Sequence, residues 1–387
     1  MRNFCIITGS RSEYGLLKNV IIKSKNSKTL NPKLIITGSH LSKHYGSTIK
    51  EILRDKIKID YKIKGFLKEN NLEKDILKNI SILIDKFSKI FIKIKPDIIL
   101  ILGDRYEIFS AAIAAIFLKI PIAHIHGGET TYGSLDEYIR HSITKMSAVH
   151  FVATKKYKKR VIQLGENPKY VHMVGSLAYE SILKLGLYNK KQLLKDIGLE
   201  GLTKMIIITF HPVTNLKKNS IDQIIPLLNV LENYTEYALI FTMPNADANS
   251  GYISSSIKKF VKKNYKNSKY FKSMGQLLYY SALKHSELCI GNSSSGIIEA
   301  PYLKTITINI GDRQKGREMA KSIISCKNKV TSIQKAFSKG IRIAKQKKQS
   351  YIFKNPYEYI ISSNKILSVL ENMKLNKDIY SKVFYDI

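Results

Sequence analysis

The sequence predicts an α/β protein made of two Rossmann-like domains, each with a parallel sheet, facing each other across a cleft. First, its 387 residues exceed the length that one hydrophobic core usually reaches, about 250–300 residues. Second, short apolar runs alternate with longer amphipathic stretches, which is typical of βαβ units. Third, polar turns follow most of the apolar runs, as at the ligand-binding edge of an open parallel sheet. We expect one domain over residues 1–177, a second over 178–356, and a C-terminal helix at about 357–387 that packs back on the first.

The first half contains five predicted buried strands. They span residues 3–8, 33–37, 97–102, 122–126 and 150–153. Between them, residues 72–94 place Ile and Leu at helical spacing, and residues 108–117 form an Ala-rich helix. The turns TGSRSEYG, GDRYE and HGGETTYGSLDE follow three of the strands, so we expect ligand binding and catalysis there.

The second half repeats this pattern after a helical, Lys-rich stretch over residues 178–200. Its predicted strands span residues 205–210, 238–242, 288–290 and 305–308. The turns that follow them are HPVTN, MPNADANSG, GNSSSG and GDRQKGR. A second ligand-binding edge is therefore predicted opposite the first.

The composition excludes several classes of protein. The net charge of +34 suits a nucleic acid or an anionic membrane, but the lysines are spread along the whole chain rather than gathered in one stripe with aromatic residues. No run approaches the ~18 apolar residues of a membrane span, and the start is a strand rather than a secretion signal. Three distant cysteines indicate neither a disulfide framework nor a zinc site. We expect a cytoplasmic protein with no nucleic-acid and no membrane partner.

The turn GNSSSGIIE, residues 291–299, has the features of a phosphate site. Free backbone N–H groups at a helix start, beside small side chains, bind phosphate oxygens, and Glu299 is placed to accept from ribose hydroxyls. Ordinary helix capping explains Ser and Gly equally well. The cationic loop GDRQKGR and a strand-end histidine favour a nucleotide diphosphate. The candidate residues are His211, Asn292, Ser293, Ser294, Ser295, Gly296, Glu299 and Arg313.

Carboxylates and imidazoles gather in the first half. Asp104 and Arg105 follow a strand, although an acidic residue there is more often a helix cap. The next turn is denser, and it contains His126, Glu129, Asp136, Arg140 and His141. Such a set suits proton abstraction and return, because neighbouring charges separate the pKa values of similar groups. A divalent metal is the alternative, disfavoured because no compact ligand motif such as His-x-x-x-His is present.

Two further segments of the first half contain polar residues whose roles differ. Arg11 follows the first strand at a position suited to an anion, and Glu13 fits the first turn of the next helix. His40 and His44 are interpreted as loop and helix surface.

These motifs, in this order, resemble the UDP-N-acetylglucosamine 2-epimerases. They are TGSRSEYG, GDRYEIFSAAIAA, HIHGGE, LDEYIRHSITKMS, HPVT, GNSSSGIIE and INIGDRQKGR. The likeness is strongest to the hydrolysing bacterial enzymes of sialic-acid synthesis, often called NeuC. It implies a glycosyltransferase-B-like fold, no metal and no cofactor, and a homodimer or higher homo-oligomer. It also implies conversion of UDP-N-acetylglucosamine and water to N-acetylmannosamine and UDP.

The resemblance also implies residue roles. Asp104 and Asp136 match catalytic carboxylates, and Arg140 and His141 belong to the stretch typical of the hydrolysing branch. The positions that match nucleotide-binding residues are Arg11, His211, Ser293, Ser294, Glu299 and Arg313.

One position departs from the family pattern. His126 stands where many relatives carry Glu, which leaves open whether His126 or Glu129 handles the C2 proton. Three other reactions stay open: a hydrolysing epimerase for a GDP-linked or diacetamido sugar, a non-hydrolysing epimerase, and a glycosyltransferase, since the fold alone decides none of them.

Overall fold

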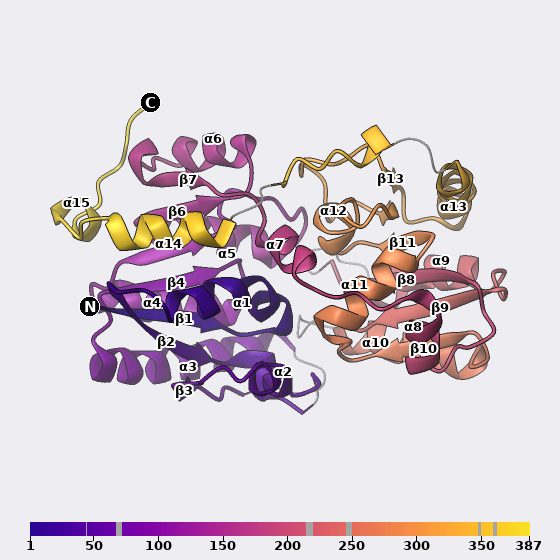
Figure 1. The fold of residues 1–387 in the computed structure, drawn as a ribbon, viewed down its shortest axis with the longest axis horizontal. Helices are drawn as coiled ribbons and strands as arrows, with labels where there is room; N and C mark the ends of the chain where they lie inside the picture. Colours follow the sequence, from indigo (N-terminus) through magenta and orange to yellow (C-terminus); the bar gives the residue numbers. More distant parts are fainter. Residues whose placement is uncertain (44, 67–71, 214–219, 245–249, 347–349, 359–361) are drawn as a thin grey trace.

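Two lobes make up the protein, and Figure 1 shows them side by side. The structure is a computed structural model. The residues that it describes are 1–43, 45–66, 72–213, 220–244, 250–346, 350–358 and 362–387. Each lobe is built on its own parallel sheet flanked by helices, so the predicted fold class is confirmed.

The first lobe contains a seven-stranded sheet in the order β3-β2-β1-β4-β5-β6-β7. All neighbouring strands pair in parallel. The strands are β1 (Arg2–Thr8), β2 (Leu30–Ile36), β3 (Tyr61–Lys62), β4 (Ile98–Leu102), β5 (Ile122–Ile125), β6 (Val149–Val152) and β7 (Val171–Met173). The direction of winding reverses between β1 and β4, and ligands of open α/β sheets bind at such a point.

Helices cover both faces of this sheet because side chains alternate along each strand. The helical segments are α1 (Arg11–Ser24), η1 (Gly38–Leu41), α2 (Ile49–Arg54), α3 (Glu73–Ile94), α4 (Tyr106–Phe117), α5 (Leu135–Met146), α6 (Lys155–Gln163), η2 (Pro168–Tyr170) and α7 (Leu177–Leu183). Phe4 and Ile6 of β1 share a core with α1, whereas Cys5 and Ile7 share another with α3 and α4.

The second lobe repeats the arrangement with a six-stranded sheet in the order β10-β9-β8-β11-β12-β13, again parallel throughout. Its strands are β8 (Lys204–Thr209), β9 (Tyr237–Thr242), β10 (Ser268–Phe271), β11 (Leu288–Gly291), β12 (Ile306–Ile310) and β13 (Ile323–Cys326). The helical segments are α8 (Lys190–Asp196), α9 (Ser220–Leu231), α10 (Ser250–Lys263), α11 (Gly275–His285), α12 (Ser295–Ile298), α13 (Val330–Lys345) and η3 (Ser350–Phe353). Winding reverses between β8 and β11.

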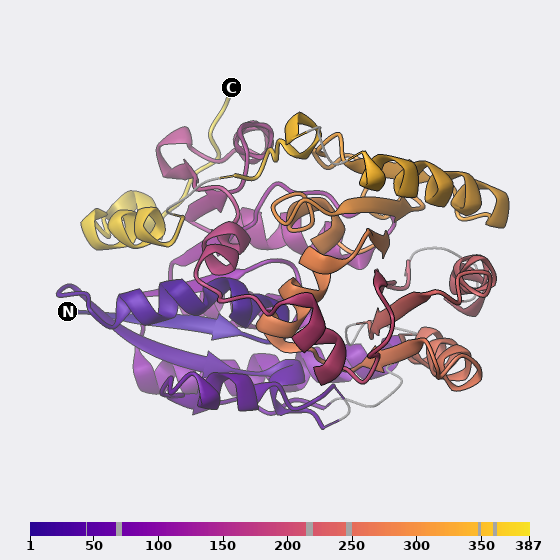
Figure 2. The ribbon, with the colours of Figure 1, turned by 45° about the vertical axis from the view of Figure 1, so that its right-hand side comes forward.

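The end of the chain returns to the first lobe, as Figures 1 and 2 show. It forms two helices, α14 (Ser362–Asn372) and α15 (Lys377–Tyr380), instead of one helix over 357–387. Ile366 and Leu370 of α14 join the core beneath α1. The guanidinium of Arg2 donates to the carbonyl oxygens of Leu370 and Met373 at 2.8 and 2.6 Å. The division of the domains at residue 177 stays a prediction.

The strands expected from the sequence are all present, but four more are found. The additional strands, β3, β7, β10 and β13, lie at the four edges of the two sheets. Their side chains are mostly half-buried or exposed, so their sequences lack a continuous apolar run. The predicted helical stretch over 178–200 is two helices, α7 and α8. Within the described ranges, no helix has the length and apolarity needed to cross a membrane.

Candidate active site

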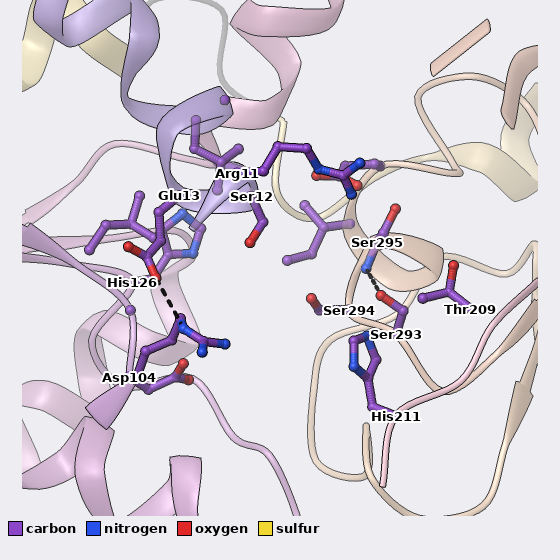
Figure 3. A pocket seen from close by; sticks show the side chains of 18 of the residues that line it. Arg11, Ser12, Glu13, Asp104, His126, Thr209, His211, Ser293, Ser294 and Ser295 are labelled. Atoms are coloured by element: carbon purple, nitrogen blue, oxygen red, sulfur yellow. Dashed lines mark hydrogen bonds and ion pairs between the residues drawn. The ribbon is translucent and has the colours of Figure 1, made fainter. Parts of the chain in front are cut away.

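The two points of reversed winding face each other across one pocket between the lobes. Figure 3 shows Arg11, Glu13, Asp104 and His126 on one side, and His211 with the serines at 293–295 on the other. Residues from both lobes therefore line a single site, as the sequence predicts.

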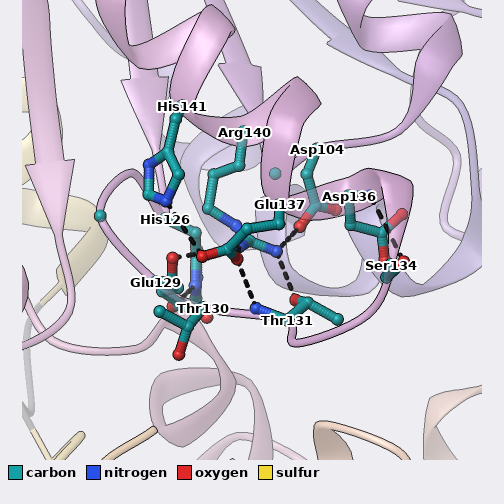
Figure 4. A network of polar contacts seen from close by, with 12 residues as sticks. Asp104, His126, Glu129, Thr130, Thr131, Ser134, Asp136, Glu137, Arg140 and His141 are labelled. Atoms are coloured by element: carbon teal, nitrogen blue, oxygen red, sulfur yellow. Dashed lines mark hydrogen bonds and ion pairs between the residues drawn. The ribbon is translucent and has the colours of Figure 1, made fainter. Parts of the chain in front are cut away.

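A buried arginine, Arg140 on α5, organises the wall formed by the first lobe (Figure 4). Its guanidinium forms an ion pair with Asp104, donates to Glu137 Oε2 at 3.0 Å and donates to Thr131 Oγ1 at 2.6 Å. Burial disfavours the cation, but the carboxylates of Asp104, Glu129 and Asp136 together outweigh it, and the pKa of Arg140 is raised. Asp104 therefore lies at the pocket paired with a buried guanidinium.

A second chain of polar contacts runs through Glu129. Its Oε1 lies 2.5 Å from His126 Nδ1, and its Oε2 accepts from Arg317 at 2.5 Å. Burial favours the neutral acid, yet Arg317 and His126 hold the pKa of Glu129 well below its usual range. His126 has a φ of 69°, a left-handed conformation uncommon outside glycine, which turns the chain sharply after β5.

A buried carboxyl at the start of α1, that of Glu13, has the opposite character. Its Oε2 accepts from the Gly9 backbone N–H at 2.6 Å, and its Oε1 lies 3.7 Å from Arg105 Nε. Arg105 is shared, because it also donates to both oxygens of Glu107 at 3.2 Å. Burial raises the pKa of Glu13 to about 7 even with this cation nearby. Glu13 is thus a pocket-lining carboxyl that exchanges a proton near neutral pH.

The turn after β11 in the second lobe presents small and uncharged groups instead. Asn292 bridges to His211 by accepting from its backbone N–H at 2.7 Å and donating to its carbonyl at 2.8 Å. Gly291 has a φ of 141°, and a Cβ there would lie 1.8 Å from the Thr209 carbonyl oxygen, so β11 needs glycine to approach β8. The turn that follows places Ser293 and Ser294 at the pocket.

Glu299 lies beyond these serines, below the tyrosines of α11. Tyr280 donates to Glu299 Oε1 at 3.4 Å, and Tyr279 and Ser295 are joined by a hydrogen bond of 2.5 Å. Burial raises the pKa of Glu299 although Arg11 opposes this.

Side chains of the loop after β12 cross from the second lobe to the first. Arg313 donates to Asp136 Oδ2 at 3.2 Å and to the Asn292 carbonyl at 3.2 Å. Arg317 donates from Nε to the Thr130 carbonyl at 2.8 Å, in addition to its contact with Glu129. We call these contacts of Arg313 and Arg317 the interlobe bridge, and it closes one side of the pocket.

Most of the site residues predicted from the sequence line this pocket. They are Arg11, Asp104, Arg105, His126, Glu129, Asp136, Arg140, His211, Ser293, Ser294, Ser295, Glu299 and Arg313. Three others lie just behind it: His141 beside Glu137, Asn292 beneath His211, and Gly296 against Thr307. The interpretation of His40 as surface is wrong, because its imidazole is buried between Thr8 and Thr48. His44 and the turn residues 214, 215 and 245–249 lie outside the described residues.

The sequence assigns no individual role to several residues that line the pocket. Arg317 belongs to the predicted cationic loop GDRQKGR, but nothing in the sequence shows that it reaches the opposite lobe. Tyr279, Tyr280 and Gln276 lie on α11, an amphipathic helix whose pattern indicates only packing. In the part of the chain that the structure describes, no three His, Cys, Asp or Glu side chains are grouped to hold a metal ion.

Comparison with known proteins identifies the family. A model of the UDP-N-acetylglucosamine 2-epimerase family matches residues 22–371. The chain belongs to this family. The resemblance drawn from the sequence motifs is thereby confirmed.

Individual members of the epimerase family align over most of the chain. The chain is 41% identical over 338 residues to a GDP/UDP-N,N'-diacetylbacillosamine 2-epimerase (hydrolyzing) of Campylobacter jejuni, covering 87% of each protein. It is 39% identical over 393 residues to polysialic acid biosynthesis protein P7 of Escherichia coli, covering 100% of this chain and 98% of the relative.

A solved epimerase shares the fold. The UDP-N-acetylglucosamine 2-epimerase of Neisseria meningitidis bound to UDP-N-acetylglucosamine superposes with a TM-score of 0.79 at 21% identity, covering 96% of this chain and 99% of that one. The glycosyltransferase-B-like arrangement expected from the resemblance is thus confirmed.

Proposed function

We propose that this epimerase hydrolyses UDP-N-acetylglucosamine to N-acetylmannosamine and UDP. The observation that carries the proposal is the contrast across the pocket: Asp104, paired with Arg140, and the His126 imidazole on one wall, and the serines at 293–295 on the other. The first wall suits proton chemistry on a sugar, and the second suits a nucleotide diphosphate. The N. meningitidis structure in the same fold contains UDP-N-acetylglucosamine, which supports this class of substrate.

The second lobe is assigned to the nucleotide. Ser293 and Ser294 supply donors for phosphate oxygens, and Arg313 adds a cation to balance the charge of departing UDP. Glu299 is placed to accept from ribose hydroxyls. His211 and Ser295 complete this wall of the pocket, and Arg11 of α1 adds a cation from the first lobe.

The first lobe is assigned to the sugar. The bond between C1 and the diphosphate oxygen breaks, UDP leaves with the electron pair, and the C2–H electrons form the C1=C2 double bond of a glycal. The C2 proton passes to a base, which we assign to His126 because both Glu129 oxygens are engaged. Water then adds its oxygen to C1 while a proton reaches the opposite face of C2. Asp104 and Asp136 are assigned to charge stabilisation at C1 and to this proton return.

A second substrate is favoured by one relative. The C. jejuni protein is named for a GDP- or UDP-linked diacetamido sugar, and it shares 41% identity with this chain. The E. coli relative is named for polysialic acid biosynthesis, which favours N-acetylmannosamine as the product. We place the diacetamido sugar nucleotide second for this reason.

Product analysis tests both substrates. Purified protein is incubated in D2O, without added metal, with UDP-N-acetylglucosamine, UDP-N,N'-diacetylbacillosamine or its GDP counterpart. We expect free N-acetylmannosamine carrying one deuterium at C2, with UDP released in equal amount. A higher kcat/KM with a diacetamido sugar nucleotide would show that this compound, and not UDP-N-acetylglucosamine, is the preferred substrate. Unlabelled product would exclude the glycal route, and return of UDP to C1 would indicate a non-hydrolysing epimerase.

We further propose a cytoplasmic homodimer. The family resemblance favours the dimer, and a nucleotide-sugar substrate favours the cytoplasm. Sedimentation equilibrium on the purified chain measures the oligomeric state directly, and a monomer at micromolar concentration would reject the homodimer.

A further inference from the structure

Three buried side chains form a continuous path from the second lobe to the pocket. Arg317, in the loop after β12, contacts Glu129 of the first lobe at 2.5 Å, and Glu129 contacts His126 Nδ1 at 2.5 Å. The side chains of Arg317, Glu129 and His126 are 5%, 4% and 9% exposed. Charges so deeply buried persist only when each is paired, so the members of this path depend on one another.

Glu129 is an acceptor on both sides. Arg317 occupies Oε2 and His126 occupies Oε1, while the Arg140 guanidinium donates to the Glu129 backbone carbonyl at 3.0 Å. Since these cations keep the carboxylate ionised, Glu129 accepts a hydrogen bond from Nδ1–H and retains no free oxygen for the sugar. Its place is that of an orienting group behind the imidazole.

The orientation of His126 follows from this contact. When Nδ1 carries the proton donated to Glu129, the other ring nitrogen of a neutral imidazole has the free electron pair. His126 lines the pocket, and its Nε2 atom is buried. This Nε2 has no hydrogen-bond partner among the described residues. Figure 4 shows His126 and Glu129 side by side on the turn that follows β5.

We propose that Arg317 is a positioning residue which the second lobe supplies to the first, acting through Glu129 to fix the tautomer and charge of His126. This inference rests on the proposed function, because His126 is the base assigned to the C2 proton. Under this proposal, His126 has the tautomer needed to accept the C2 proton only when the lobes are closed and the interlobe bridge is formed.

Other charges also act on His126. Glu299, from the end of α12, interacts with it across the pocket, and Arg140 on α5 acts through Glu129. These groups stay unchanged in the variants below, so differences between variants report Arg317 and Glu129.

We call the path from Arg317 through Glu129 to His126 the relay. The pH profile of kcat/KM distinguishes a relay that acts on His126 from a contact that only holds the lobes together. Glu129→Gln removes an anion beside the imidazole, so the acid limb of the profile is expected to move about one pH unit lower, with kcat/KM at pH 7 falling about 10²-fold. Arg317→Met removes the cation that neutralises Glu129, so the acid limb is expected to move to higher pH. Arg317→Lys retains the cation and is expected to restore most of the shift.

Lys156 provides a matched control. Its ammonium donates to the Gly316 carbonyl at 3.1 Å and so joins the two lobes without touching the relay. Lys156→Ala is expected to leave the acid limb in place and the rate within about twofold. Equal loss of rate at all pH values in Arg317→Met, or the same shift in Lys156→Ala, would overturn the proposal.

A spectroscopic measurement on the intact protein is independent of turnover. In a long-range ¹H–¹⁵N spectrum of ¹⁵N-histidine-labelled wild type, assigned by its difference from His126→Asn, we expect neutral His126 to carry its proton on Nδ1. A proton on Nε2 would overturn the relay even if the protein is active. Absence of sugar-nucleotide turnover with the expected tautomer would reject the proposed function instead. If Arg317→Met fails to fold, this spectrum and the Glu129→Gln profile decide the question.

Discussion

The two lobes share one topology and differ in the chemistry of their strand ends. In the first lobe, the turns after β1, β4 and β5 present charged groups that are paired with each other, such as Asp104 with Arg140. In the second lobe, the turns after β8 and β11 present hydroxyl, amide and backbone groups, such as Asn292 on His211. The same frame therefore supports proton transfer on one side and anion binding on the other, because function lies in the residues placed on a fold.

The largest effect is expected from removing the Asp104 carboxylate of the first lobe. Asp104→Asn should lower kcat about 10³-fold, since charge at C1 and proton transfer both lose support. UDP binding should stay within about threefold by calorimetry, because most of the residues assigned to UDP lie on the other lobe and Asp104 is not among them. Comparable losses of kcat and UDP affinity would show that the lobes do not divide these tasks. Thermal melting is the control, since Asp104→Asn leaves buried Arg140 less well paired.

A smaller effect is expected on the nucleotide side. Arg313→Ala removes a charge-assisted contact to the diphosphate and the bridge to Asp136, and KM should rise about 100-fold. Lys321→Ala is a matched control for the loss of one positive charge, because the Lys321 ammonium lies over the Tyr351 ring, away from the pocket. If both variants raise KM equally, the cationic surface as a whole, and not Arg313, attracts the substrate.

Burial of the Glu13 carboxyl in the first lobe is expected to make the free energy of unfolding depend on pH. Its folded pKa of about 7 lies above the ordinary 4.5, so its contribution to stability is complete below pH 4.5 and is lost as the pH rises through 7. Glu13→Gln cannot ionise, so its free energy of unfolding relative to wild type should increase by about 2 kcal/mol between pH 5 and pH 8. Urea unfolding at each pH measures this. If the difference in free energy of unfolding between Glu13→Gln and wild type is the same at every pH, the raised pKa of buried Glu13 is contradicted.

The smallest effect is expected at His141, which lies behind the pocket. Its Nε2 is 3.3 Å from Glu137 Oε1 and has no direct access to a ligand in the pocket. His141→Ala should change kcat/KM less than about threefold, the effect of one partly exposed contact. A loss above tenfold would place His141 in the substrate site, as the family resemblance suggests from sequence alone.

The interior of the fold was predictable from sequence because central strands are buried on both faces. Strands such as β4 and β8 are nearly all apolar and buried, whereas the side chains of edge strands such as β3 and β13 are half-buried or exposed and leave little pattern. His40 was misplaced for a related reason. A histidine satisfied by Thr8 and Thr48 is as polar in sequence as one at the surface, and only the fold brings the threonines to it.

The candidate site was predictable as a set of strand ends but not as a set of partners. The rule that ligands bind at the carboxyl ends of parallel strands brings Asp104, His126 and Ser293 together without any coordinates. It does not say that Arg317 crosses to Glu129, because that contact joins residues 188 positions apart on different lobes. Contacts of this kind depend on how two rigid domains dock, which short-range pattern does not encode.

The interlobe bridge has a consequence for the fate of the intermediate. After UDP separates, the glycal of the proposed reaction is neutral and lacks the phosphates that anchored it, so little besides enclosure retains it. The closed pocket then decides a partition between capture by water and escape into solution. A chain with a looser bridge would lose part of every turnover as free glycal, and the yield of sugar per UDP released becomes a direct gauge of how firmly the two lobes stay together.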